Sequence, residues 1–208
     1  MEKKRSEFVA GVIMLNFPAK KYNLILADPA WTYSLGTRDG QASNHYDTMP
    51  LEDICNLPVR EISDKNCYLF LWATSPTLKQ ALEVMERWGF SYRMVAFVWS
   101  KTNQIMGLGH YTRTNHEFVL LGKKGTLERK SRKVAQWIKA PARRHSEKPN
   151  RVREDIIKLY GDLPRIELFG RIKAVGWDTW GNDEKLKLNP LENFTTDSQS
   201  LINKDLLL

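Results

Sequence analysis

An apolar run at residues 67–74, CYLFLWAT, constrains the fold more than any other segment of the chain. Its length is that of a single strand, and its side chains are apolar on both faces. A strand of this kind lies in the middle of a sheet that is covered on both sides. Pro76 follows closely, at a position suited to the first turn of a helix. The run therefore predicts a central strand that leads into a helix packed on the sheet.

The rest of the chain alternates between strand-like and helix-like patterns. Strands are predicted at 22–27, 92–101, 116–125 and 165–171, and a last strand or hairpin arm at 174–183. Helices are predicted at 50–57, from Pro76 to Gly89 and from Pro149 to Gly161. This alternation is typical of an α/β sheet with helices on both faces. Residues 126–147 have little periodicity and are predicted to form a loop. The length suits one domain, with a polar tail from Glu184 onward.

The net charge of +8 is concentrated in one stretch. Residues 123–158 contain 13 Lys and Arg and four Asp and Glu, which gives +9, so the rest of the chain sums to about −1. Such a stretch is either a solvated surface or a face that binds phosphates. Nucleic acid is the class of partner that the second interpretation favours.

Cysteine and histidine usage points away from disulfide and metal chemistry. Cys55 and Cys67 lie within apolar patterns and are expected to be buried free thiols of a reducing, cytoplasmic compartment. The four histidines have no ligand-like spacing, so no metal is expected. The chain has no run of about eighteen apolar residues, so no membrane-spanning helix is expected.

The first predicted strand ends in an acid, within the segment YNLILADPAWTY. Asp28 follows the strand, and Pro29 and Trp31 come next. One interpretation is a local turn in which the aspartate caps its own backbone. The other is a polar clamp beside an aromatic wall, because functional groups gather past the carboxyl ends of strands in α/β sheets. Such a clamp suits a flat heterocycle with an exocyclic amine.

Two further segments carry weaker signals. In IELFGR, residues 166–171, an acid in a strand is followed by Phe-Gly, which is either a tight turn or a nucleotide-binding turn. In HSEKPN, residues 145–150, Lys148 precedes a helix that begins with proline. It is either a surface residue or a cation presented to a carboxylate.

Taken together, these segments resemble one known family. Asp-Pro-Ala-Trp resembles the Asp-Pro-Pro-Trp motif of amino-group methyltransferases that act on nucleic acid bases. The segments that resemble one branch of them, in the family's order from about Tyr22 to Asn182, are HYDTM, LPV, LFLWAT, WGF, VWSKTNQ, TRTNHEFVLLGKKG, HSEKP and IELFGR. The chain is identified as a member of the adenine-N6 methyltransferases typified by the seventy-kilodalton catalytic subunit of the mRNA adenosine methyltransferase.

The resemblance implies a Rossmann-like class I methyltransferase fold, circularly permuted so that the catalytic turn precedes the cofactor-binding strand. The domain would cover 1–183 and the tail 184–208, and the cofactor would be S-adenosylmethionine. Matching positions imply a catalytic clamp of Asp28, Pro29 and Trp31. The implied substrate-binding residues are Tyr46 and Glu117, to which the basic stretch adds Arg129, Lys130, Arg132 and Lys133. The implied cofactor-binding residues are Asp28, Lys148, Glu167, Phe169, Gly170, Arg171, Asn182 and Asp183.

Some positions depart from the family pattern. Ala30 stands where the second proline is usual, and Asp183 where glutamine is usual. Ile172 and Lys173 follow Arg171, where the family often has a His-Asn pair.

The implied activity is methyl transfer to the N6 amine of adenine in nucleic acid, with DNA favoured over RNA. DNA is favoured because the chain is compact, has no zinc-finger cysteines or added RNA-binding module, and resembles the stand-alone members of the family expected in bacteria or phages. Two alternatives stay open: an RNA adenosine methyltransferase, and a catalytically inactive member that only binds nucleic acid. A homodimer is one open arrangement, and no membrane partner is expected.

Overall fold

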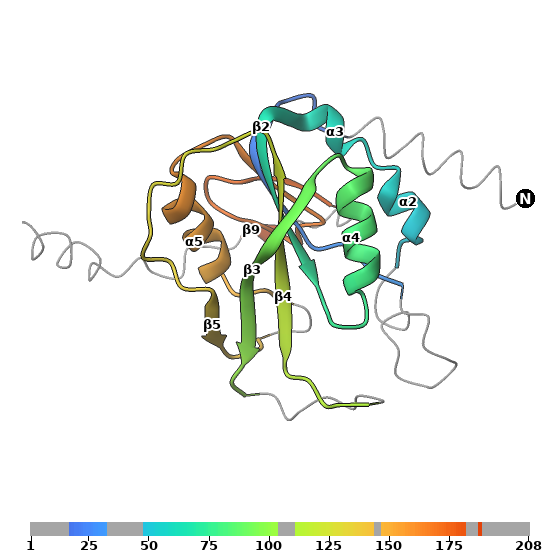
Figure 1. Ribbon diagram of the computed structural model, residues 1–208, viewed down its shortest axis with the longest axis vertical. Coiled ribbons are helices and arrows are strands. Elements are labelled where there is room, and N and C mark those ends of the chain that lie inside the picture. Colours follow the sequence, from blue (N-terminus) through green and yellow to red (C-terminus); the bar gives the residue numbers. More distant parts are fainter. Residues whose placement is uncertain (1–16, 33–47, 104–110, 144–146, 182–186, 189–208) are drawn as a thin grey trace, which may run out of the picture.

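The computed structural model describes residues 17–32, 48–103, 111–143, 147–181 and 187–188. Within these ranges the chain forms a seven-stranded sheet with helices on both faces (Figure 1). The strands run in the order β5 (Trp137–Ala140), β3 (Ser91–Lys101), β4 (His116–Lys124), β2 (Ser63–Ala73), β1 (Tyr22–Ala27), β6 (Arg165–Leu168) and β8 (Asp178–Trp180).

The direction of the strands decides where functional side chains gather. β4 is antiparallel to both of its neighbours, whereas every other adjacent pair in this sheet is parallel. The carboxyl ends of six strands and the amino end of β4 therefore meet along one border, which we call the carboxyl edge. In open α/β sheets this border is the usual place for ligands.

The prediction of a central strand at 67–74 is confirmed. β2 lies between β4 and β1, and Leu69, Phe70, Leu71 and Trp72 each expose 1% or less of their surface. Successive side chains of β2 point to opposite faces, so the strand contributes to two separate apolar clusters.

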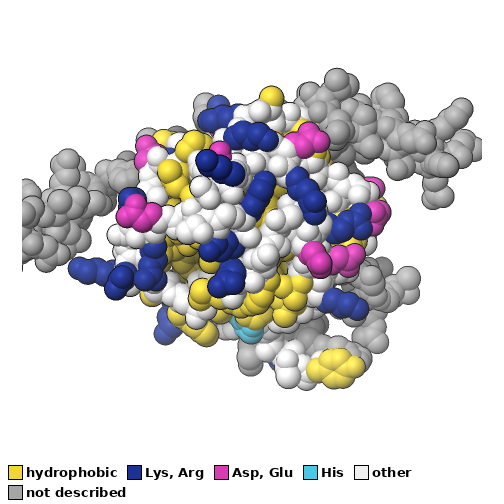
Figure 2. Space-filling view, turned by 45° about the horizontal axis from the view of Figure 1, so that its top comes forward, with side chains coloured by type: hydrophobic (Ala, Val, Ile, Leu, Met, Phe, Trp, Pro, Cys, Tyr) yellow, Lys and Arg dark blue, Asp and Glu magenta, His cyan; other side chains and the backbone are white. Residues whose placement is uncertain are grey.

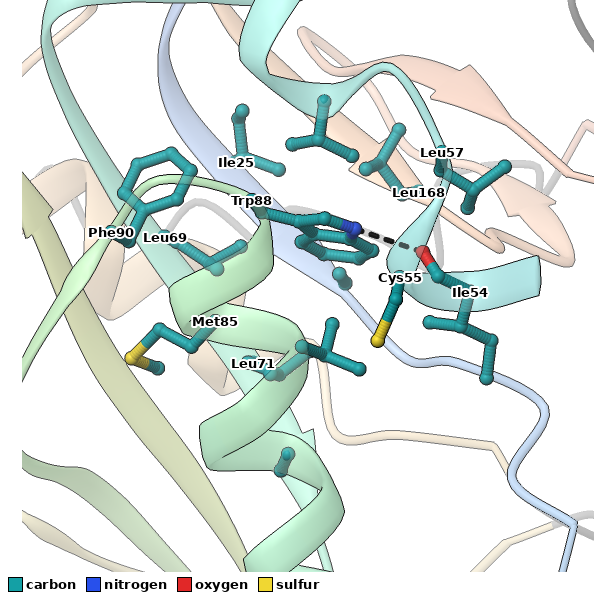
Figure 3. Packing of buried hydrophobic residues seen from close by; sticks show 14 of the residues in the cluster. Ile25, Ile54, Cys55, Leu57, Leu69, Leu71, Met85, Trp88, Phe90 and Leu168 are labelled. Atoms are coloured by element: carbon teal, nitrogen blue, oxygen red, sulfur yellow. Dashed lines mark hydrogen bonds between the residues drawn. The ribbon is translucent and has the colours of Figure 1, made fainter. Parts of the chain in front are cut away.

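Helices cover both clusters. α2 (Leu51–Cys55), α3 (Val59–Ile62) and α4 (Leu78–Arg87) pack on one face, and α5 (Arg151–Tyr160) packs on the other. Figure 3 shows the first face, where the Trp88 ring lies among aliphatic side chains of β1, β2 and α4. Its indole Nε1 donates a hydrogen bond of 2.9 Å to the carbonyl of Ile54. This bond satisfies the ring's polar atom in the core and links α4 to α2.

The prediction of a loop at 126–147 was wrong in one part, because this stretch contains the strand β5. Residues 137–140 pair with β3 in parallel, and Ile138 is buried against the α5 face. Four residues are too short for periodicity to reveal a strand. Pairing with β3 stabilises it instead.

The carboxyl-terminal strands are shorter than predicted. β6 ends at Leu168 because Phe169 adopts a left-handed backbone conformation, with φ of 63°. Within 174–183 the described strand is β8, of three residues. A separate two-stranded sheet pairs β7 (Ile172–Lys173) with β9 (Lys187–Leu188), and of these two strands β9 lies in the range predicted as a tail.

Cys55 and Cys67 are buried free thiols, as predicted. Burial raises the pKa of both, that of Cys67 to about 12. In the described parts of the chain, none of the helices is long and apolar enough to cross a membrane.

Candidate active site

Three segments that are far apart in the sequence meet at the carboxyl edge. Asp28 follows β1 directly, Glu117 is the second residue of β4, and Lys148 lies three residues before α5. The Lys148 Nζ is 2.9 Å from Asp28 Oδ2 and 3.2 Å from Glu117 Oε2. The three side chains expose 11%, 21% and 14% of their surface, in the order Lys148, Asp28 and Glu117. A single ammonium group therefore bridges two carboxylates in a largely desolvated position.

A second lysine completes this network. Lys101, the last residue of β3, places its Nζ 2.7 Å from Glu117 Oε1. Each oxygen of Glu117 thus contacts a different lysine. Two carboxylates and two ammonium groups sum to zero formal charge, so the charges of this buried cluster balance.

The network perturbs the proton affinities of its members. Burial raises the pKa of Asp28 above its ordinary value, and the nearby Lys148 only partly opposes this. Burial also acts to raise the pKa of Glu117, but Lys148 and Lys101 outweigh it and hold that pKa below its ordinary value. The two carboxylates in turn hold the pKa of Lys148 above its ordinary value, against the effect of burial. Perturbed groups gathered at a strand edge are typical of a functional site.

Two buried tryptophans lie beneath the lysines. The Lys148 Nζ is 5.3 Å from the centre of the Trp72 ring, and the Lys101 Nζ is 5.1 Å from that of Trp99. The two rings are 6.0 Å apart and nearly perpendicular. The aromatic faces favour both cations and restrict their positions.

The turn after β1 is held by backbone hydrogen bonds. The Trp31 amide donates to the Pro29 carbonyl at 2.9 Å, and the Met49 amide donates to the Ala30 carbonyl at 3.0 Å. The Pro29 oxygen keeps one lone pair for another donor. Trp31 exposes only 7% of its surface and packs in the core, so most of its ring is covered by protein. Its role as a stacking partner stays a prediction.

A second turn at the same edge follows β6. Phe169 has positive φ, and a side chain at Gly170 would meet the Thr179 methyl at 2.5 Å. A side chain at Gly181 would meet the Gly170 carbonyl oxygen at 2.6 Å. The Asp28 amide also donates to the Leu168 carbonyl at 3.3 Å, so this turn adjoins the first one. Backbone strain and close backbone approach at a sheet edge are common where a ligand binds.

Most of the chain matches a known family, in a range that contains both turns. The model of the MT-A70 family matches residues 22–183, including Asp28, Glu117 and Lys148. The chain belongs to the MT-A70 family.

Named relatives include bacterial and animal proteins. The Type II methyltransferase M.MunI of Mycoplasma sp is 38% identical over 184 residues, which cover 79% of this chain and 78% of that protein. The N(6)-adenosine-methyltransferase subunit METTL3 of Danio rerio is 30% identical, over 78% of this chain and 28% of that protein. Human N(6)-adenine-specific methyltransferase METTL4 is 28% identical, over 87% and 41%. This MT-A70 chain therefore spans less than half the length of the two animal relatives.

Other residues predicted for this MT-A70 site lie in different surroundings. Glu167 is buried in β6, and both of its oxygens accept hydrogen bonds of 2.8 Å from the Arg153 guanidinium. Arg171 is exposed, yet close enough to Asp28 to act on its pKa. Tyr46, Asn182 and Asp183 lie outside the described residues, and their roles stay predictions.

The four basic residues predicted to bind substrate are not in the Asp28 cluster. The Lys130 amide donates to the carbonyl of Leu159, at the far end of α5 from Lys148. The helix has ten residues and is therefore roughly 15 Å long. The side chains of Arg129, Lys130, Arg132 and Lys133 are exposed.

Sequence patterns did not identify Lys101, Arg153 or the pair of tryptophans as site residues. Lys101 has a detectable signal, because it ends a predicted strand at the edge that carries Asp28. In the sequence Arg153 looks like an ordinary surface residue of a helix, because its partner, Glu167, is 14 positions away. In the described residues no group of three or more His, Cys, Asp and Glu lies close enough to hold a metal ion.

Proposed function

We propose that this chain is an S-adenosylmethionine-dependent methyltransferase that methylates the N6 amine of adenine in nucleic acid, with DNA preferred. Membership of the MT-A70 family and the activities for which the three relatives are named support this. The observation that carries the proposal is the position of Asp28. Its carboxylate lies at the carboxyl end of β1, in a buried cluster of balanced charge, beside a proline whose carbonyl keeps a lone pair.

The residues of the chain would act by holding the target amine. The lone pair of an adenine amine is delocalised into the ring, so the amine is a weak nucleophile. Hydrogen bonds from its two N–H groups to Asp28 and to the Pro29 carbonyl favour a pyramidal nitrogen with a directed lone pair. Holding the nitrogen in this position supplies much of the rate enhancement. The base has to be single-stranded or flipped out of a duplex to enter the site.

The residues present fit the cofactor. The strained turn at Phe169 and Gly170 and its contact with Gly181 offer close backbone approach, and Lys148 offers a cation for the methionine carboxylate. When bound, S-adenosylmethionine supplies the methyl group. Lys148 already contacts two protein carboxylates, so a third would compete with Asp28 and Glu117 for the same ammonium group.

We also infer that the sheet is a circularly permuted class I methyltransferase sheet. Seven strands with a single antiparallel member, β4, support a Rossmann-like arrangement. The turn with Asp28 follows β1, whereas the strained turn that suits the cofactor follows β6, later in the chain. This order supports a catalytic segment that precedes the cofactor segment.

DNA is the preferred substrate in this proposal because the relative matched along most of its own length is a Type II methyltransferase. An RNA substrate is the second candidate, supported by the similarity to an N(6)-adenosine-methyltransferase subunit. The presence of Asp28 within the charged cluster argues against an inactive binding protein. Cytoplasmic location and a homodimer stay predictions.

The test is direct. The protein is incubated with methyl-labelled cofactor and either DNA or RNA of mixed sequence, and the product is digested to nucleosides. We expect label in N6-methyl-2′-deoxyadenosine. Label in N6-methyladenosine alone would transfer the proposal to RNA. Absence of label from both, with a protein that binds cofactor, would refute it.

A further inference from the structure

Trp137 is a large aromatic residue exposed to solvent on β5, one of the two edge strands of the seven-stranded sheet. It exposes 57% of its surface, whereas the next residue, Ile138, exposes 5%. Because neighbours in a strand point to opposite faces, Trp137 and Lys139 share the face away from α5. The backbone beneath the ring is fixed, since the Val98 amide donates to the Gln136 carbonyl at 2.9 Å. The ring is thus presented on a rigid element.

The segment that carries this ring is basic, although Lys130 pairs with Glu128 and Arg143 with Glu147 at its two ends. Residues 129–143 contain six Lys and Arg and no Asp or Glu. The neighbouring strand β3, whose residues Val98–Lys101 pair with β5, also has no Asp or Glu. Figure 2 shows Lys and Arg side chains spread over one face of the molecule, with fewer acidic ones between them. Aromatic platforms flanked by cations are the combination that binds single-stranded nucleic acid.

The exposed strand leads to the candidate active site. Ala140, at the end of β5, accepts hydrogen bonds from Trp99 Nε1 at 3.0 Å and from the Thr102 amide at 3.2 Å. Asn103 then pairs with the backbone of Ala142 through two bonds, of 2.8 and 2.7 Å. Trp99 lies beneath Lys101, which contacts Glu117. In the other direction the segment passes outside α5 (Figure 1) and is tied there by the Lys130 amide. The backbone of residues 130–142 therefore runs from the end of α5, along β5, to the carboxyl edge.

We propose that this path binds the strand of nucleic acid that flanks the target adenine. Trp137 stacks on one unpaired base, and the cations on either side of it contact phosphates. The inference rests on the proposed function, because it takes the Asp28 cluster as the place of the target base. It assigns Trp137 and Lys139 to substrate binding and makes the four basic residues near α5 the far end of the same track.

The test compares Trp137→Ala, Trp137→Phe and, as a matched control, Leu82→Ala, which removes an exposed apolar side chain from α4. Binding of a labelled single-stranded oligonucleotide of about 20 nucleotides is measured by fluorescence anisotropy at low salt. We expect Trp137→Ala to weaken binding about five- to 150-fold, the range for the loss of one stacked base. Trp137→Phe should retain most of the affinity, because it keeps an aromatic face, and Leu82→Ala should match the wild type.

Turnover adds a second readout. With the same oligonucleotide, Trp137→Ala should raise KM and leave kcat unchanged, because the ring does not touch the reacting atoms. The binding measurement needs no turnover, so it tests the track even if the proposed activity fails. Affinity of Trp137→Ala within twofold of the wild type would overturn the inference. So would an equal loss in Leu82→Ala, or a change in oligomeric state of Trp137→Ala, which would assign the surface to contact between copies of the chain.

Discussion

Lys148 is the residue on which the charged cluster depends. Replacing it with methionine leaves Asp28 and Glu117 buried without their shared cation. We expect S-adenosylmethionine to bind about 1–3 kcal/mol more weakly, the range for a lost charged hydrogen bond. The pKa of Asp28, already raised by burial, should rise further because Lys148 lowers it. The acid limb of the pH–rate profile should therefore move to higher pH.

Calorimetric titration of the cofactor and the rate as a function of pH measure both effects. Lys79→Met is the matched control, since that lysine is exposed on α4, away from the charged cluster and the basic segment. An unchanged dissociation constant and an unchanged acid limb in folded Lys148→Met would remove Lys148 from the site.

Arg153 and Glu167 form a pair whose role is predominantly structural in our account. Their side chains expose 14% and 5%, and the contact is bidentate. Removing one member of such a pair leaves a buried charge, which costs about 3–5 kcal/mol. We therefore expect Arg153→Met to lower the free energy of unfolding in urea by about this amount, and Arg153→Met combined with Glu167→Leu to recover much of it. A loss of cofactor affinity without loss of stability would return Glu167 to the ribose contact that the family resemblance implies.

The turn between β6 and β8 can be tested through its glycines. Gly170→Ala should disturb the turn and weaken cofactor binding, because the new Cβ would lie 2.5 Å from the Thr179 methyl. Thr179→Ser removes that methyl and should restore binding in the double variant. Gly181→Ala meets a backbone oxygen at 2.6 Å, so Thr179→Ser should not rescue it. Cofactor titration of the four variants tests this, and equal rescue of both glycine variants would contradict the steric explanation.

The basic segment between β4 and β5 should act through phosphates. Neutralising Arg129, Lys130, Arg132 and Lys133 together should flatten the dependence of log affinity on log salt, by about 0.9 per lost contact for duplex DNA. kcat at saturating substrate should stay the same, since these residues lie at the far end of α5 from Lys148. Binding by the wild-type protein that does not respond to salt would make the segment an ordinary solvated surface.

Local patterns predicted the elements that bury apolar surface and missed those that pairing alone stabilises. The run at 67–74 predicted β2, and helical spacing predicted α4 and α5. The strand β5 was not predicted, because it buries only one residue, Ile138, between exposed neighbours. The strand predicted at 165–171 was too long because sequence gives little sign that Phe169 takes positive φ.

Part of the site was predictable and part was not. Asp28 and Lys148 were found through a strand end, a helix start and the family resemblance, and the structure brings them to 2.9 Å. The link between Glu117 and Lys101 depends on β4 running antiparallel between β2 and β3, which periodicity does not specify. Long-range pairing of this kind, including Arg153 with Glu167, has no local signature.

At the scale of the whole molecule, the carboxyl edge of the sheet supports the charged cluster that contains Asp28. The central claim is that Asp28 holds the target amine at this edge. The most direct measurement is single-turnover methyl transfer by Asp28→Ala to an adenine-containing oligonucleotide, with the fold and cofactor affinity checked by circular dichroism and calorimetry. Asp28 follows the strand and is not part of the apolar core, so the variant should fold and still bind cofactor. We predict a loss in rate of at least about a hundredfold, the lower range for a positioned acid or base. A rate near that of the wild type would contradict the account and leave Asp28 as a residue that only shapes its own turn.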